Sequence, residues 1–292
     1  MECVRGAAAT MPELPELEVL KEVVGARIIG QTASSTRAPR PGILKTLEPT
    51  LDTLIGKRLA AMERRGKHVI LSFEPGLHLV LHLMLAGRRL VCASSTRWTK
   101  ATGFVISWEN GEDLRLVEGG STKRASIHLV RDPEEVPRVA RAGIEPLSPA
   151  FTVDALTAMV TGRRRQAKKL LTDQANLAGI GAAYADEILF AAGVSPLRYV
   201  NRLSPAEIER LHSAIRTVLV EAIEALREVA DHTANLGEAR PFARVYKRTG
   251  QPCVRCGTPI AEIRYAETRT YYCPRCQAGG RQLPDRRAWL TR

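Results

Sequence analysis

Near its end the chain reads Cys253-Val254-Arg255-Cys256 and, after sixteen intervening residues, Cys273-Pro274-Arg275-Cys276. Each two-residue spacer lets a tight turn point both thiolates at one ion, and the stretch between the pairs can form two strands that bring the turns together. The spacing therefore predicts one structural Zn²⁺ held by Cys253, Cys256, Cys273 and Cys276; two disulfides or an iron-sulfur site are the alternatives. Four protein ligands close the coordination sphere, so the ion is expected to hold the fold and to leave no position for an activated water.

The zinc segment belongs to a strongly basic chain. The 292 residues include 43 Lys and Arg against 31 Asp and Glu, a formal net charge of +12, and the isoelectric point is about 9.8. The excess is concentrated in residues 241–292, which hold 11 basic and 3 acidic side chains. Many basic proteins only carry solvated charge, but an excess of this size also suits a protein that neutralises phosphates. The composition favours a nucleic-acid partner.

Length and cysteine placement restrict the class of protein. The chain exceeds the size that one hydrophobic core usually supports, so two or three domains are expected. No apolar stretch approaches the ~20 residues of a membrane span. Cys3 and Cys92 lie far from the other four cysteines, which favours a metal site over a disulfide framework. We expect a monomeric cytoplasmic protein with no membrane contact.

Upstream of the zinc segment the sequence changes from a strand pattern to a helix pattern. Between residues 27 and 144 short apolar stretches alternate with turn signals such as Glu74-Pro75-Gly76 and Glu109-Asn110-Gly111, which predicts a β-rich unit of hairpins. Beyond Leu147-Ser148-Pro149 the apolar residues recur with helical spacing. The expected strands cover residues 58–62, 68–73, 77–85, 103–108, 114–117 and 125–130, and the expected helices cover 152–161, 165–176, 182–192 and 204–229.

The N-terminal region contains a candidate nucleophile in Met11-Pro12-Glu13-Leu14-Pro15-Glu16. We expect translation to begin at Met11, because residues 1–10 are too short and too weakly apolar for a secretory signal. Removal of Met11 then gives Pro12 a free secondary amine, whose ordinary pKa of ~7.7–8.0 leaves it partly neutral and able to attack carbon. The simpler interpretation is the start of a helix whose apolar stripe is Leu14, Leu17 and Leu20.

Taken in order, these motifs resemble the formamidopyrimidine-DNA glycosylase and endonuclease VIII family of DNA glycosylases. The hexapeptide is similar to the family's mature N-terminus. Further similar segments are Arg64-Arg65-Gly66-Lys67 (active-site lysine), His82-Leu83-Met84-Leu85-Ala86-Gly87 (a strand turn), residues 171–190 with Gly179-Ile180-Gly181 (helix-two-turns-helix), and Arg244-Val245-Tyr246 with the four cysteines and Gln277 (zinc finger).

The resemblance implies an α+β fold in three parts. An N-terminal catalytic β-sandwich with flanking helices is expected over residues 12–146, after a leader of residues 1–11 that the mature protein lacks. A helix-two-turns-helix DNA-binding domain is expected over residues 147–240, and a zinc-finger hairpin over residues 241–292.

The resemblance also implies a bifunctional DNA glycosylase and AP lyase that removes oxidised bases from duplex DNA in base excision repair, associated with the nucleoid through that DNA. Pro12 would attack the sugar C1′ to form an imine, Glu13 would transfer protons, and Lys67 would hold a phosphate or help to open the deoxyribose. Without the resemblance, the favoured interpretation of Glu13 is a helix-start carboxylate, and that of Lys67 is a solvated charge at the end of a strand. The alternatives are a non-catalytic DNA-binding protein of the same fold and an unrelated zinc-ribbon protein.

The duplex is expected to be held mainly through its phosphates. The run Arg163-Arg164-Arg165 and the pair Lys168-Lys169 lead into the glycine turn, which can offer backbone N–H groups to a phosphate. A charge run is otherwise usually a solvated helix face. The candidate DNA-binding residues are Lys100, Lys123, Arg124, Arg164, Lys168, Gly181 and Arg269.

The chain departs from the family pattern at four places. Ala182 stands where the family has an asparagine, and Thr268 stands where it has the finger-tip arginine, with Arg269 one residue later. The loop of residues 118–124 lacks the family's aromatic wedge. The segment of residues 231–240 is shorter than in members that clamp 8-oxoguanine there, which favours oxidised pyrimidines or a broad range of lesions.

The Pro12 hypothesis predicts a difference between two forms of the protein. The form that begins at Pro12 should be trapped on abasic-site duplex by borohydride, which reduces an imine to a stable amine. The 292-residue form with its leader attached should not be trapped, because an acylated proline nitrogen has no lone pair to donate. Equal trapping of both forms would exclude Pro12 as the nucleophile.

Overall fold

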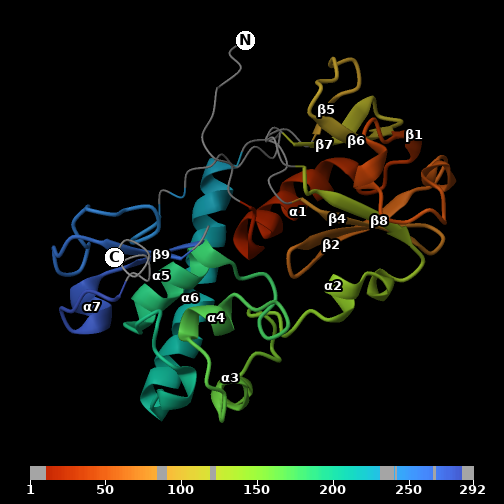
Figure 1. The fold of residues 1–292 in the computed structure, drawn as a ribbon. Coiled ribbons are helices and arrows are strands. Elements are labelled where there is room, and N and C mark those ends of the chain that lie inside the picture. The colour runs from red at the N-terminus through yellow and green to blue at the C-terminus, as the bar shows by residue number, and fades with distance from the viewer. Residues whose placement is uncertain are drawn as a thin grey trace. The chain divides into compact units, whose positions relative to one another are not determined.

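The computed structural model describes residues 11–83, 91–118, 123–230, 240, 242–265 and 268–284. The chain divides into two compact units: unit 1 comprises residues 1–141 and 223–239, and unit 2 comprises residues 142–222 and 240–292. The division falls within the long helix α6 (Pro205–Val229), so both units include part of that helix. Strands in unit 1 and helices in unit 2 give the predicted α+β class (Figure 1). The sequence-based boundaries at residues 146 and 240 remain predictions.

Unit 1 contains two four-stranded antiparallel sheets. The first has the order β1 (Ala33–Arg37), β6 (Thr102–Trp108), β7 (Glu112–Val117), β5 (Val91–Ala93), and the second has the order β2 (Leu59–Arg65), β3 (His68–Phe73), β4 (Leu77–His82), β8 (Ser126–Val130). Its helical elements are α1 (Leu14–Ile28), η1 (Pro41–Ile43), η2 (Leu51–Leu54), η3 (Pro133–Glu135), α2 (Pro137–Ala140) and the end of α6.

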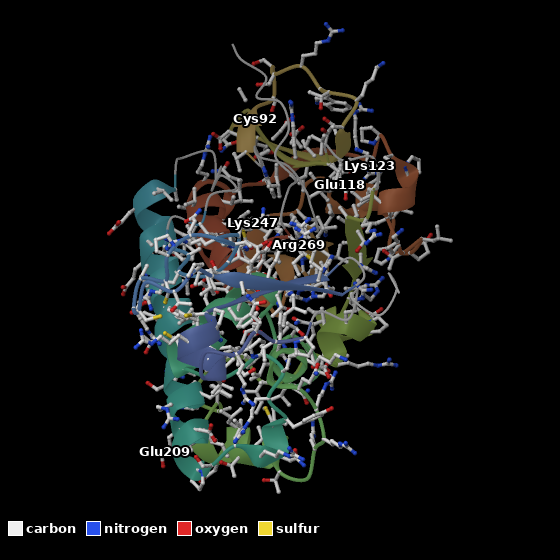
Figure 2. The ribbon with its side chains drawn as sticks, turned by 60° about the vertical axis from the view of Figure 1, so that its left-hand side comes forward. Cys92, Glu118, Lys123, Glu209, Lys247 and Arg269 are labelled. Carbon is white, nitrogen blue, oxygen red and sulfur yellow. The ribbon has the colours of Figure 1, made fainter. Side chains whose placement is uncertain are left out.

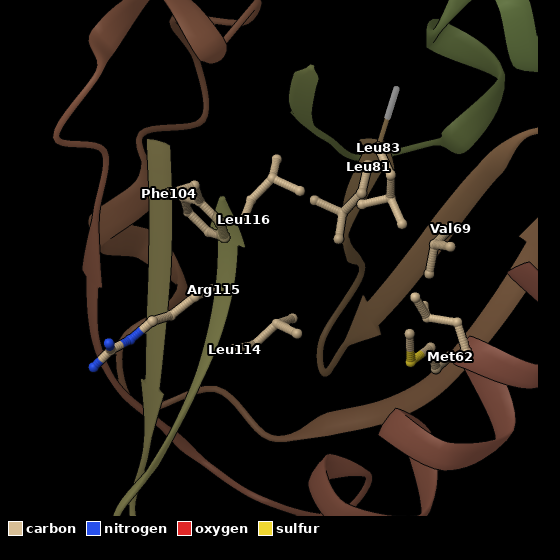
Figure 3. Close-up of a pocket in the computed structure, with 9 residues that line it drawn as sticks. Met62, Val69, Leu81, Leu83, Phe104, Leu114, Arg115 and Leu116 are labelled. Atoms are coloured by element: carbon tan, nitrogen blue, oxygen red, sulfur yellow. The ribbon is translucent and has the colours of Figure 1, made fainter. Parts of the chain in front are cut away.

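The two sheets and α1 share one apolar core. Leu17 and Val24 of α1 pack in one buried cluster with residues of both sheets, such as Leu71 and Phe104. Arg227 near the end of α6 forms two hydrogen bonds with Glu22 of α1, at 2.7 and 2.8 Å. A small cavity between the sheets is lined by apolar side chains, and Arg115 turns its guanidinium away from it (Figure 3); the other lining residues are Leu20, Met62, Val69, Leu81, Leu83, Phe104, Leu114 and Leu116.

Each of the six predicted strands has a counterpart, and both predicted turns connect hairpins. The structure adds β1 and β5, which the sequence did not reveal. Strand β1 is mostly polar (Ala33-Ser34-Ser35-Thr36-Arg37) and β5 has only three residues, so neither presents an alternating apolar pattern. The strand predicted over residues 77–85 is seen as β4, and residues 84 and 85 lie outside the described part of the chain.

Unit 2 combines helices with a two-stranded finger. Its helical part contains α3 (Val153–Val160), α4 (Ala167–Leu171), α5 (Ala182–Ala192), η4 (Val200–Arg202) and the start of α6. The finger contains β9 (Ala261–Tyr265), β10 (Thr268–Tyr272) and α7 (Pro274–Ala278), with β9 and β10 paired antiparallel. Phe190 of α5 packs with Val245, Ile260 and Tyr271, so the finger core continues onto α5. None of the described helices has the length and apolar character to cross a membrane.

Helix α4 is shorter than the predicted helix of residues 165–176. The carboxylate of Asp173 accepts hydrogen bonds from the Ala175 N–H at 3.1 Å and from Arg165 at 2.6 Å. Side-chain bonds of this kind compete with the helical ladder and end it. Gln174 then accepts from the N–H of Gly179 at 2.9 Å, which closes the following turn. The periodicity of apolar residues does not reveal these polar contacts.

Gly143 lies against the backbone of this turn. Its N–H donates to the carbonyl of Gln174 at 2.8 Å, and a Cβ at this position would lie 2.3 Å from the Asn176 carbonyl oxygen. Because backbone cannot swing aside as a flexible side-chain end can, Gly143→Ala should lower the free energy of unfolding by about 1–3 kcal/mol in a denaturant titration. Gly42→Ala, where no atom lies within 4 Å of the new Cβ, is the control. Equal stability of the two variants would contradict this packing.

Candidate functional site

The four cysteine sulfurs converge in the finger, within 4.8 Å of one another. Cys256 Sγ lies 3.5 Å from the sulfurs of both Cys273 and Cys276, and Cys253 Sγ lies 3.9 Å from that of Cys276. Zn–S bonds of about 2.3 Å place the sulfurs of a tetrahedral site about 3.8 Å apart. The donor set therefore fits one Zn²⁺. The described cysteines form no disulfide, which removes that alternative.

The first cysteine turn is fixed to the end of helix α5. The Arg255 guanidinium donates to the carbonyls of Phe190 at 2.8 Å and Ala191 at 3.1 Å, and lies over the Phe190 ring at 4.4 Å. Carbonyls in the last turn of a helix lack intrahelical partners and carry the negative end of the dipole, so a cation is favoured there. Gln277 connects the second cysteine turn to the segment that follows α5, because its side-chain amide donates to the Val194 carbonyl at 2.9 Å.

Helix α5 also holds the segment that precedes the finger. Glu187, 4% exposed, accepts hydrogen bonds from three consecutive backbone N–H groups, those of Arg244, Val245 and Tyr246, at 2.8, 2.9 and 2.8 Å. These contacts give the Arg244-Val245-Tyr246 motif a structural role. The sequence showed the motif but not its carboxylate partner, which lies 57 residues upstream of Arg244.

Lys168 occupies a different environment from an exposed phosphate ligand. Its ammonium lies 2.7 Å from the buried carboxylate of Asp186 on α5 and donates to the Arg269 carbonyl and the Thr270 hydroxyl, both at 2.9 Å. Burial raises the pKa of Asp186 to about 7, and the Lys168 ammonium acts in the opposite direction. The phosphate contact of Lys168 stays a prediction.

The other basic candidates in unit 2 lie on its surface. Arg164 is exposed, with its guanidinium carbon 5.6 Å from the centre of the Tyr199 ring. Arg269 is exposed on β10, opposite Arg264 of β9 (Figure 2). Gly181 is the N-cap of α5, a position where backbone N–H groups and the helix dipole favour an anion.

In unit 1, Pro12 and Glu13 lie at the start of α1. Pro12 is half-buried and Glu13 is 5% exposed. Glu13 is the N-cap of the helix, and its backbone N–H donates to Glu16 Oε2 at 3.0 Å as part of a capping box. Glu13 is therefore a helix-start carboxyl group, as the simpler interpretation predicts. It also follows Pro12 directly in the chain, so the same residue stands next to the candidate nucleophile.

Lys67 is next to two buried histidines. It lies in the turn between β2 and β3, after Gly66 with a φ of +57°. The rings of His68 and His82 are 4.8 Å apart, and the two residues are 6% and 7% exposed. Burial lowers the pKa of His68 to about 4 and that of His82 to about 3, with a smaller contribution from Arg138 to each. Both imidazoles are therefore neutral near pH 7.

Lys123 and Arg124 lie next to the buried residue Glu118. Glu118 forms an ion pair with Arg40 at 2.6 Å, and its side chain accepts from the backbone N–H groups of Arg124 and Ala125, both at 2.8 Å. Lys123 donates to the Glu118 carbonyl (Figure 2). No pattern in the sequence signals the Arg40–Glu118 pair, whose members are 78 residues apart.

The remaining sequence predictions concern an exposed loop lysine and residues that the structure does not describe. Lys100 is exposed in the loop before β6. Four stretches that carry sequence predictions lie outside the described part of the chain. They are residues 1–10, residues 84–87 of the expected strand turn, residues 119–122 of the loop, and residues 231–239 of the shortened segment.

Comparisons with known proteins match all three segments. The formamidopyrimidine-DNA glycosylase N-terminal domain matches residues 11–120, its H2TH domain residues 142–232, and the zinc finger found in FPG and IleRS residues 250–279. The formamidopyrimidine-DNA glycosylase of Symbiobacterium thermophilum is 35% identical over 95% of this chain and 93% of its own. That of Moorella thermoacetica is 36% identical over 87% and 95%. Matches outside the finger exclude an unrelated zinc-ribbon protein.

Solved structures show the same architecture. The MutM (Fpg) protein of Thermus thermophilus superposes with a TM-score of 0.80 at 32% identity, covering 91% of this chain and 98% of that one. Lactococcus lactis Fpg in a complex with abasic-site DNA gives a TM-score of 0.82 at 27% identity, covering 91% and 99%.

The buried histidine pair predicts how stability depends on pH. Below pH 6.5 the unfolded chain binds protons that folded His68 and His82 do not bind until about pH 4 and 3. Stability is therefore fully present above pH 6.5 and is lost as pH falls, by roughly 2–4 kcal/mol between pH 7.5 and 5.0 from this pair. His68→Gln should remove about half of that loss in denaturant titrations at the two pH values. Identical pH dependence in the variant and the parent would contradict the assignment.

Proposed function

The chain belongs to the formamidopyrimidine-DNA glycosylase family, and we propose that Pro12, Glu13 and Lys67 carry the family's reaction in it. The protein is a DNA glycosylase of base excision repair with AP lyase activity, and its finger holds one structural zinc. Its partner is double-stranded DNA that contains damaged bases. We infer that it works as a monomer on DNA in the cytoplasm, at the nucleoid.

The reaction requires a damaged nucleotide to leave the base stack, because the sugar C1′ is not accessible inside the duplex. The Pro12 nitrogen donates its lone pair to C1′, the bond from C1′ to the base breaks, and the base leaves with a proton. Ring opening, in which O4′ leaves C1′ and takes up a proton, then gives a cationic imine (iminium) between Pro12 and C1′. Loss of a proton from C2′ expels the 3′ phosphate and breaks the strand, and water releases the protein from the sugar.

Two features of unit 1 support these roles. Glu13 is a buried carboxyl group adjacent to the nucleophile, held by the first turn of α1, and a positioned acid of this kind can transfer protons to the base and the sugar. Lys67 has neutral imidazoles of His68 and His82 in its vicinity. Neither imidazole therefore adds a positive charge beside the Lys67 ammonium at neutral pH, and we propose that this ammonium holds a phosphate or helps to open the sugar ring.

We propose that the protein binds DNA through phosphate contacts of residues in both units. Lys100, Lys123 and Arg124 are exposed in unit 1, and Arg164 and Arg269 are exposed in unit 2. Gly181 can contribute backbone N–H groups at the start of α5. Such contacts position a duplex without reading its sequence, which suits an enzyme whose target is a lesion. Oxidised pyrimidines or a broad range of lesions remain the preferred substrates on sequence grounds.

The carboxyl group of Glu13 provides the test of this function. Glu13→Gln should slow excision of a damaged base by about 10²–10⁴-fold, the usual contribution of a positioned acid or base. Cleavage at a preformed abasic site should be slowed less, because no base has to be protonated. Single-turnover assays on the two duplexes measure both rates.

Glu16→Gln is the matched control, since it removes the same charge from the same helix start and weakens the capping box. It should leave both rates near those of the parent. Unchanged base excision in Glu13→Gln would mean that Glu13 only caps α1.

A further inference from the structure

A buried ion pair connects the helix-two-turns-helix segment to the finger. Lys168 of α4 and Asp186 of α5 have side chains that are 13% and 0% exposed, with 2.7 Å between the ammonium and the carboxylate. Breaking such a pair on one side leaves an uncompensated buried charge. Both members also contact strand β10, so the pair does more than join two helices.

The contacts fall on one edge of β10. Among the described strands, β10 pairs on one side only, with β9. The C=O of one residue and the N–H two residues later point to the same edge of an extended strand. Lys168 donates to the Arg269 carbonyl at 2.9 Å, and the Tyr271 N–H donates to Asp186 at 3.1 Å. The ion pair thus supplies the partners that a third strand would supply.

The ammonium of Lys168 is engaged within the protein. A lysine ammonium has three N–H donors, and here three acceptors surround it: the Asp186 carboxylate, the Arg269 carbonyl and the Thr270 hydroxyl. Two of these acceptors belong to β10, one of them the backbone of the exposed Arg269. A two-stranded hairpin is only marginally stable by itself, so such edge contacts help to fix the position of strand β10.

We propose that Lys168 and Asp186 are positioning residues that fix strand β10 and thereby place the Arg269 side chain for its DNA phosphate. This rests on the proposed function of Arg269 as a phosphate contact. It replaces direct phosphate binding by Lys168 with an indirect role: the lysine acts through the backbone of the residue that touches DNA. Asp186 is included because it holds both the ammonium and the next N–H along the same strand edge.

A double-mutant cycle between Lys168 and Arg269 tests the proposal. Affinity for a duplex with a reduced abasic site is measured over a range of salt concentrations for Lys168→Met, Arg269→Ala and the double variant. Arg269→Ala should weaken binding about ten- to hundredfold and lower the salt slope by about one phosphate. Lys168→Met should approach this effect, and the double variant should bind no worse than Arg269→Ala.

Additive losses, with a slope lowered by two phosphates in the double variant, would show that Lys168 binds its own phosphate and would overturn the proposal. Unchanged binding by Lys168→Met would overturn it too. Lys169→Met, which removes the neighbouring exposed charge, should give the same small fold-change whether or not Arg269 is present.

A charge-free variant separates positioning from folding. Lys168→Met alone leaves the Asp186 carboxylate buried and unpaired, whereas Lys168→Met with Asp186→Asn removes both charges. Thermal stability and zinc content should recover in this second variant, while DNA affinity should stay low because the Arg269 carbonyl has no partner. Recovery of affinity together with stability would reduce the pair to a purely structural role. Because these readouts are binding and stability, a failure to form the imine would refute the proposed reaction without deciding this point.

Discussion

Two consecutive carboxylates on helix α5, those of Asp186 and Glu187, are the contacts on which unit 2 depends. Glu187 accepts three backbone N–H groups of residues 244–246, and Asp186 accepts the N–H of Tyr271 in β10. Neighbouring side chains on a helix point about 100° apart, so one helix holds both the entry to the finger and its hairpin. Arg255 closes the carbonyl end of the same helix. The zinc ligands are therefore assembled on a support that α5 provides.

In unit 1, the buried titratable groups of His68, His82 and Glu118 are either neutral or paired with an opposite charge. His68 and His82 lose their charge through burial, and Glu118 is paired with Arg40 while its carboxylate also holds two backbone N–H groups. Neither histidine therefore adds a positive charge beside Lys67 at neutral pH.

Much of the fold and the zinc site could be predicted, because the patterns that indicate them are local in sequence. The spacing of the cysteines, the hairpin turns and the helical periodicity of α5 and α6 each depend on nearby residues, and they led to elements that the structure contains. The early end of α4 was missed because Asp173 ends it with side-chain hydrogen bonds. The Asp186 partner of Lys168 was also missed, because a charge run reveals a charge without its partner, here a carboxylate 18 residues away on another helix; the phosphate contact of Lys168 stays a prediction.

The proposed reaction depends on attack of the Pro12 amine, beside a buried Glu13, on the sugar. Its most direct measurement is the position of the covalent bond to DNA. The borohydride-reduced complex of the Pro12-terminal protein with lesion duplex is digested, and the cross-linked peptide is sequenced by mass spectrometry. We expect the nitrogen of Pro12 to carry the sugar remnant. A remnant on Lys67, or on any other amine, would contradict it.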